Sequence, residues 1–133
     1  MNIVINTAHQ RFGGAVQGVL SFINECKKYP KNDYYIWVGT GVAKSLKKQN
    51  FPNNFHFTFF NFSAIKLMDT FAINKTLQEH EKKLKPDVII STSGPTYFQS
   101  SVPQVIGYTL PLYIYPESPY LNELSRGLYS SIR

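Results

Sequence analysis

The N-terminal stretch combines a short apolar run, a pair of glycines and an amphipathic pattern. Ile3, Val4 and Ile5 are typical of a short buried β-strand. After Gly13 and Gly14, apolar side chains recur at three- and four-residue spacing, which predicts a helix with one buried face. These apolar residues are Val16, Val19, Leu20, Ile23 and Cys26. A strand, a glycine turn and a helix in this order form the first βα unit of an open α/β sheet.

The rest of the chain alternates between strand and helix patterns. Strands are predicted where apolar and β-forming residues cluster, at 34–38, 55–59, 87–91 and 102–108. Helices are predicted over 42–49 and from Ser63, a suitable N-cap, to Lys85, where the following Pro86 ends the second helix. The long helix has apolar positions at Leu67, Phe71, Leu77 and Leu84. Strands alternating with helices predict an α/β domain with a mostly parallel sheet and right-handed crossovers.

Composition restricts the class of protein. A chain of 133 residues with 43% hydrophobic and 17% charged residues is typical of one globular domain. The net charge of +6 favours anionic partners, and nucleic acid, an anionic membrane surface and a phosphorylated substrate all fit it. The lysines are scattered and no nucleic-acid motif appears, so nucleic acid is not expected as a partner. No basic, apolar leader and no membrane-length apolar run is seen, which predicts a cytoplasmic protein.

Several kinds of site are excluded by missing motifs. A dinucleotide-binding enzyme would carry G-x-G-x-x-G after the first strand, and a P-loop nucleotidase would carry G-K-[ST]; neither is present. The three histidines and the single Cys26 are far apart in sequence, and no pair has metal-ligand spacing. We therefore expect no metal and no cofactor. The lone cysteine also excludes an internal disulfide, and its place on the apolar helix face predicts a buried thiol.

A helix end followed by an apolar strand, Lys-Pro-Asp-Val-Ile-Ile-Ser at 85–91, resembles the N-terminal half of group 1 (family 4) glycosyltransferases of the GT-B fold. The same family has a Gly-Gly loop after its first strand, as at Phe-Gly-Gly-Ala 12–15, and a polar loop after the P-D-V-I strand, as at 91–96. A strand opening with Val-Pro follows, as at 102–107. Residues 110–117 are similar to the next segment in some bacterial surface-polysaccharide members. The resemblance covers the whole chain as an order of elements.

The resemblance implies a Rossmann-like, three-layer αβα domain over residues 1–133, the acceptor-side half of a GT-B fold. A C-terminal domain of the same chain would bind most of a nucleotide-diphosphate sugar, and residues 121–133 would begin a helix leading towards it. Full-length members are retaining, metal-independent glycosyltransferases that move the sugar to a polysaccharide or lipid-linked glycan acceptor. The acidic E-x7-E motif of the second domain does not occur in these residues. We therefore expect the 133 residues alone to be inactive.

The glycine loop supplies the candidate donor site that the resemblance implies. Gly13 and Gly14 would approach the donor phosphates, and Arg11 could pair with a phosphate from the same loop. His9 is the candidate catalytic residue, because an imidazole there could donate a hydrogen bond to the acceptor or to the leaving group. A purely structural βα turn and a solvated loop would use the same residues, so both interpretations stay open.

The acceptor is expected near the carboxyl ends of the fourth and fifth strands, where the ligands of open α/β sheets bind. The candidate acceptor-binding residues are Ser93, Gly94, Pro95 and Thr96 after the fourth strand, Tyr108 and Thr109 after the fifth, and Glu117 in a late loop. Hydroxyls and backbone groups suit a sugar, although an ordinary turn would also use them.

Three lysines of the short helix, Lys44, Lys47 and Lys48, lie near Phe51 and could contact anionic lipid. This would hold the protein peripherally at the inner face of the membrane, but a solvated helix face has the same composition. Phe60 and Phe62, at the end of the third strand, are expected to be exposed. The alternative to a transferase is a non-catalytic α/β binding or assembly module.

Overall fold

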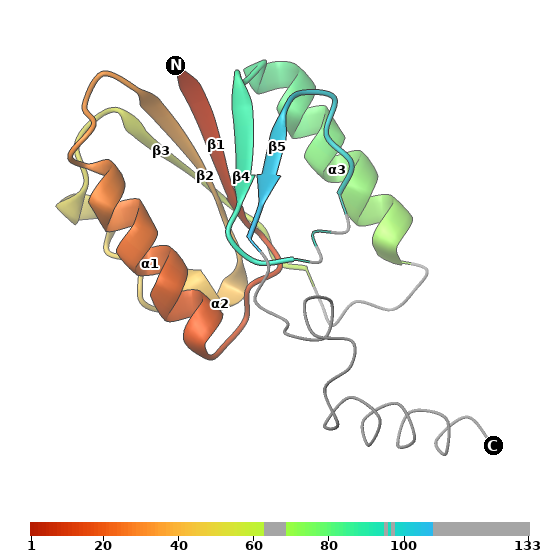
Figure 1. Cartoon of the computed structure of the whole chain (residues 1–133). Coiled ribbons are helices and arrows are strands. Elements are labelled where there is room, and N and C mark those ends of the chain that lie inside the picture. The colour runs from red at the N-terminus through yellow and green to blue at the C-terminus, as the bar shows by residue number, and fades with distance from the viewer. Residues whose placement is uncertain (63–68, 95, 97, 108–133) are drawn as a thin grey trace, which may run out of the picture.

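The computed structural model describes residues 1–62, 69–94, 96 and 98–107 (Figure 1). Its elements, in chain order, are β1 (Asn2–Thr7), α1 (Gly14–Cys26), β2 (Asp33–Val38), α2 (Thr40–Ala43), the 3-10 helix η1 (Lys48–Asn50), β3 (Phe55–Phe59), α3 (Asp69–Leu84), β4 (Val88–Ser91) and β5 (Gln104–Ile106). The predicted alternation of strands and helices is confirmed along this part of the chain.

All five strands form one parallel sheet in the order β3-β2-β1-β4-β5. The chain first builds outward from β1 through β2 to β3, and α3 then carries it back to place β4 on the other side of β1 (Figure 1). This is the strand order of Rossmann-like sheets, in which the direction of winding reverses beside the first strand. We call the boundary between β1 and β4 the switch point. The α/β class and the parallel sheet are thus confirmed.

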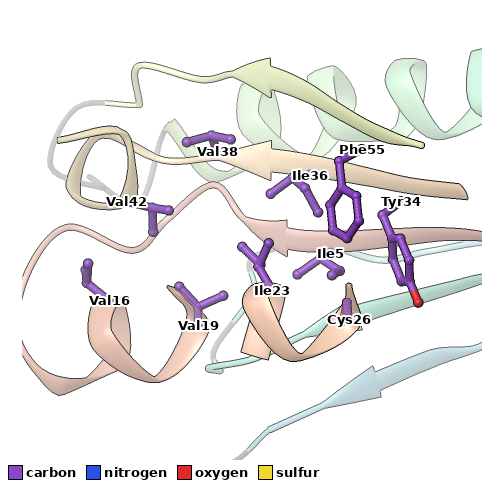
Figure 2. Packing of buried hydrophobic residues seen from close by; sticks show 10 residues of the cluster. All are labelled: Ile5, Val16, Val19, Ile23, Cys26, Tyr34, Ile36, Val38, Val42 and Phe55. Carbon is purple, nitrogen blue, oxygen red and sulfur yellow. The ribbon is translucent and has the colours of Figure 1, made fainter. Parts of the chain in front are cut away.

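Alternate residues of the strands pack into two separate cores, because successive side chains point to opposite faces of a sheet. Ile5 and Ile36 face α1, whereas Val4 and Trp37 face α3. The α1 core, shown in Figure 2, consists of Ile5, Val16, Val19, Ile23, Cys26, Tyr34, Ile36, Val38, Val42 and Phe55. The α3 core consists of Val4, Ala8, Trp37, Phe60, Ile73, Leu77, Ile89 and Phe98.

The buried face of α1 follows the predicted pattern. Val16, Val19, Ile23 and Cys26 are buried against the sheet, and Leu20 is partly buried at the margin of the core. Burial raises the pKa of the Cys26 thiol, and the neighbouring Glu25 carboxylate raises it further. The thiol therefore acts as a small core side chain, as the sequence indicated.

The predicted helix over 42–49 is wrong in its bounds. The structure has a four-residue helix, α2, that ends at Ala43, and a separate 3-10 turn that begins at Lys48. A helix of two turns has too few internal hydrogen bonds to fix its own limits, so tertiary contacts set them. Lys44, Lys47 and Lys48 therefore do not share one helix face.

The long helix is confirmed in its C-terminal part, where α3 ends at Leu84, and Lys85 adopts a left-handed φ of 47° before Pro86. Ser63 and Leu67 lie outside the described residues. Phe71 was expected on the buried face, but it is 84% exposed. It precedes Leu77 by six positions, roughly 240° around a helix, so the two cannot share a face. Ile73 and Leu77, four positions apart, form the buried stripe instead.

The expected exposure at the end of β3 is also wrong. Phe60 is only 8% exposed and packs edge-on against Trp37, whereas Phe59 is 46% exposed. The N–H of Phe60 still donates to Val38 O at 2.8 Å, so the alternation of the strand continues and turns this ring towards α3. Phe62 is partly buried and stacks on Phe60 at 5.3 Å.

The fifth strand is shorter than predicted, because it spans Gln104–Ile106, and Tyr108 lies outside the described residues. The segment that connects β4 to β5 is held by polar groups of α3. The buried Glu81 carboxylate Oε1 accepts hydrogen bonds from Ser101 N at 2.8 Å, Ser101 Oγ at 2.6 Å, Ser100 Oγ at 3.0 Å and Val102 N at 3.2 Å. A single carboxylate oxygen on α3 thus anchors the connection between β4 and β5 through four hydrogen bonds.

We predict that Glu81→Ala destabilises the fold by about 1–3 kcal/mol, since it leaves several partly buried donors without an acceptor. The control is Glu79→Ala on the same helix, which removes an exposed carboxylate and should change stability by less than about 0.5 kcal/mol. Urea unfolding of the two variants measures the difference. Equal losses would mean that Glu81 does not hold the crossover.

Candidate functional site

The carboxyl ends of β1 and β4 meet at the switch point, and a loop follows each strand there. Asn6 pairs with Ser91 at the last position of the β1–β4 ladder, so residues 8–13 and 92–94 leave the sheet side by side. The two loops are joined by Gln10, whose Nε2 donates to Thr92 Oγ1 at 2.6 Å. Ligands of open α/β sheets bind at such a boundary. This is the candidate site.

Gln10 is a site residue that the sequence did not reveal. Its side chain is only 7% exposed, and its Oε1 has no hydrogen-bond partner among the described residues. A glutamine in a polar loop is usually solvated, and no local pattern marks this one as buried. Its burial follows from the approach of the β4 loop, which is a tertiary event.

The glycine pair lies at the carboxyl edge of the sheet, as expected from the βα pattern. Gly13 is the N-cap residue of α1 and has a φ of 78°, a conformation that favours glycine. A Cβ placed on Gly13 or on Gly14 would meet nothing within 4 Å, so the space in front of both is open. The helix has no side-chain cap hydrogen bond. The Val16 N–H donates to Gly13 O at 3.1 Å, and the preceding N–H groups of Gly14 and Ala15 can bind an anion.

Arg11 is tied to the end of the neighbouring strand. Its Nη2 donates to the Phe62 carbonyl oxygen at 2.7 Å, and the side chain is partly buried. The guanidinium has five N–H donors, so this bond occupies one of them. Arg11 thus links the glycine loop to the segment after β3, and its pairing with a phosphate stays a prediction.

His9 belongs to the same loop, and its ring stacks on Phe62 at a centroid distance of 5.4 Å. Burial lowers the pKa of His9, and the nearby Arg11 charge lowers it further, while a hydrogen bond with the Thr96 backbone opposes both effects. The neutral imidazole is therefore favoured, and it can donate or accept a hydrogen bond without carrying charge. The structure brings His9 and Thr96 together, although they are far apart in sequence.

The candidate acceptor residues divide into two groups. Ser93 and Gly94 lie in the loop after β4, where the Gly94 N–H donates to Gly107 O at 2.9 Å. Thr96 is buried, and its hydroxyl donates to Phe98 O at 3.1 Å, so this side chain also stabilises the loop. Pro95, Tyr108, Thr109 and Glu117 lie outside the described residues.

A groove of about 570 Å³ opens beside Gly14, between α1 and the strands β4 and β5. Apolar groups such as Phe22, Ile90 and Val105 supply most of its lining, and Ser91 and Thr92 supply its polar end. The groove exists because α1 packs over β1 and β2, and among the described elements none covers this face of β4 and β5 (Figure 1). Its existence depends on the strand order, and no local pattern in the sequence indicates it.

Two further glycines, in the turn after β2, pack against the backbone of the candidate site. A Cβ on Gly41 would lie 2.1 Å from Arg11 O, and one on Gly39 would lie 2.5 Å from Thr7 O. The Gly41 N–H also donates to Gln10 O at 3.1 Å. The β2–α2 turn therefore passes against the backbone of the candidate loop at a distance that only glycine permits.

Within the described ranges there is no group of three or more His, Cys, Asp or Glu residues that could hold a metal ion. No helix in that part of the chain has the length and apolar character needed to cross a membrane. No protein-family model, curated protein or solved structure matches this chain.

We predict that Gly41→Ala destabilises the protein by about 1–3 kcal/mol, because the added methyl group forces apart two backbone segments. The matched control is Gly18→Ala, where a Cβ meets nothing within 4 Å. That helical substitution should be neutral or stabilise by up to about 1 kcal/mol. Urea unfolding compares the two, and a Gly41→Ala variant as stable as Gly18→Ala would show that this packing is not tight.

We predict that His9 makes stability depend on pH. Its folded pKa lies below the ordinary value of 6.5, so the unfolded chain takes up a proton first and stability falls as the pH drops below 6.5. Replacing the ring by a neutral one in His9→Phe should shrink the stability loss between about pH 7.5 and about pH 5.5. Unfolding at both pH values tests this, together with an NMR titration of the His9 ring. A titration midpoint at or above 6.5 would contradict it.

Proposed function

We propose that this chain is the N-terminal, acceptor-side half of a retaining GT-B glycosyltransferase. Such an enzyme would move a sugar from a nucleotide-diphosphate sugar to a polysaccharide or lipid-linked glycan acceptor, without a metal. A further domain of the same protein would supply most donor contacts. The support is the order of motifs, the Rossmann-like strand order and the position of the glycine turn at the switch point.

The observation that carries the proposal is the open glycine turn at the N-terminus of α1. A departing nucleotide diphosphate gains negative charge, and preorganised N–H groups at a helix N-terminus stabilise that charge without needing to reorganise. No Cβ projects from Gly13 or Gly14, so phosphate oxygens can approach the backbone closely. Arg11 would add a cation at the edge of the same site.

The acceptor would enter from the β4 side. The backbone of Gly94, the hydroxyls of Thr92 and Ser93, and the groove beside Gly14 offer polar and apolar contacts of the kind that a sugar ring uses. For His9, held neutral, to donate a hydrogen bond to the acceptor or to the leaving group, the loop would have to expose its two ring nitrogens, which are buried in the described structure. We place the enzyme in the cytoplasm, at the inner face of the membrane when the acceptor is lipid-linked.

One observation favours the alternative, a non-catalytic binding or assembly module. Val105 and Ile106 on β5 are exposed, and the groove beside them is mostly apolar. Exposed apolar patches of this kind often bind other proteins. The two functions differ in their ligand, because the transferase requires an anion at Gly14 and the module does not.

We predict that UDP or GDP shifts the backbone amides of Gly13, Gly14 and Ala15 in NMR spectra, with weak affinity, and that Gly14→Val abolishes these shifts. The control is Gly18→Val, one turn further along α1 and equally open, which should keep the shifts. In a complete enzyme, Gly14→Val should lower turnover more than it lowers stability, because the position is not packed.

Nucleotide binding and self-association together separate the transferase from the assembly module. Tight calorimetric binding of a nucleotide sugar to these 133 residues would contradict the proposal, since most donor contacts should lie in another domain. Unchanged amide shifts in Gly14→Val would remove the phosphate role from the glycine turn. Absence of nucleotide shifts, combined with self-association that a polar substitution at Val105 abolishes, would favour the assembly module.

A further inference from the structure

Lysines and aromatic rings contact one another where the C-terminal end of α1, the η1 turn and the edge strand β3 meet. The Lys27 Nζ lies 4.0 Å from the centroid of the Phe51 ring, and the Lys48 Nζ lies 4.2 Å from that of Phe59. We call Lys27, Lys47, Lys48, Phe51 and Phe59 the basic–aromatic surface. Both of its rings lie at the edge strand β3. Phe59 is the last residue of this strand, and Phe51 packs on Phe57 at 5.3 Å, on the same face of the strand.

A small polar pit lies beside Lys47 and Phe51 of this surface. Its volume is about 100 Å³, and Asn24, Ser45, Lys47 and Asn50 supply polar groups to its lining. The Lys27 Nζ, which donates to Asn24 Oδ1 at 2.7 Å, lies at its side. Amide, hydroxyl and ammonium groups together are the donors that bind phosphate oxygens.

Positive charge is concentrated in the chain segment that supplies most of this surface. Residues 24–51 hold six lysines and only two acidic residues, and one of these acids, Glu25, is already paired with Lys28. The opposite flank of α1 borders the apolar groove instead. The two flanks of one helix therefore differ in chemistry.

We propose that the basic–aromatic surface docks on an anionic lipid bilayer, with a lipid phosphate in the pit. Lysines near a bilayer are attracted by its negative surface potential, and an exposed aromatic ring enters the headgroup region beside them. Phe59 meets this description, because its ring is 46% exposed and the Lys48 ammonium group lies over it. A soluble anion would contact only the polar pit and would not account for the exposed Phe59 ring, whereas a bilayer would contact both.

The basic–aromatic surface overlaps the lysine set that the sequence suggested. Lys47 and Lys48 belong to it, and Lys27, the C-cap residue of α1, joins them because tertiary packing brings it over Phe51. Docking of this surface does not depend on sugar transfer. Vesicle binding can therefore fail while the nucleotide shifts at Gly14 persist, and the reverse can also occur.

The test is co-sedimentation of the 133-residue protein with vesicles of about 30% phosphatidylglycerol in phosphatidylcholine, at about 0.1 M salt. We expect binding to these vesicles and not to pure phosphatidylcholine. Lys47→Gln with Lys48→Gln should weaken partitioning by on the order of tenfold or more. The charge-matched control is Lys82→Gln with Lys83→Gln, two exposed lysines in the last turn of α3, which should change it by less than about threefold.

A second pair of variants tests the aromatic contact. Phe59→Ala should lower partitioning severalfold, whereas Phe71→Ala, which removes an equally apolar and more exposed ring on α3, should not. If the two double-lysine variants lost vesicle partitioning equally, net charge alone would explain the binding, and the proposal would be overturned. Binding of inorganic phosphate or of an oligonucleotide, with no binding to anionic vesicles, would overturn it as well.

Discussion

Parallel pairing on both sides of β1 is the constraint on which the rest of the structure depends. Ile5 pairs with Ile36 of β2 on one side and with Ile90 of β4 on the other. Because both ladders are parallel, the loops after β1, β2 and β4 all leave the sheet at the same edge. The glycine turn, the buried Gln10 bridge and the β4 loop become neighbours only through this pairing.

Glycine serves two opposite purposes around that edge. Gly39 and Gly41 are required because backbone passes against them, at distances where any side chain would collide. Gly13 and Gly14 instead leave empty space in front of a helix N-terminus, and only Gly13 also needs a left-handed φ. The first pair holds the loop in place, and the second pair leaves it open to a ligand. A rigid loop with an open face is what an anion site without a metal requires.

The two flanks of α1 connect the proposed chemistry to a surface. One flank borders an apolar groove that begins at Gly14, and the other flank lies beside Lys47 and Phe51 of the basic–aromatic surface. Phe59 is the last residue of β3, so the basic–aromatic surface reaches the same carboxyl edge of the sheet as the glycine turn. The proposals for the site and for the surface nevertheless depend on different residues.

Elements with strong local patterns could be predicted from the residues alone: β1, α1, β2, β3, β4 and the end of α3 at Pro86. Their periodicity reports which face is buried, and burial drives their formation. Other features depend on tertiary packing, which local patterns do not encode. They are the bounds of α2, the burial of Phe60, the exposure of Phe71 and the hydrogen bond from Gln10 to Thr92. These features depend on which segment packs against each residue, and the strand order fixes that choice. The sequence therefore marked the glycine turn as a candidate site, whereas only the fold supplied its neighbours.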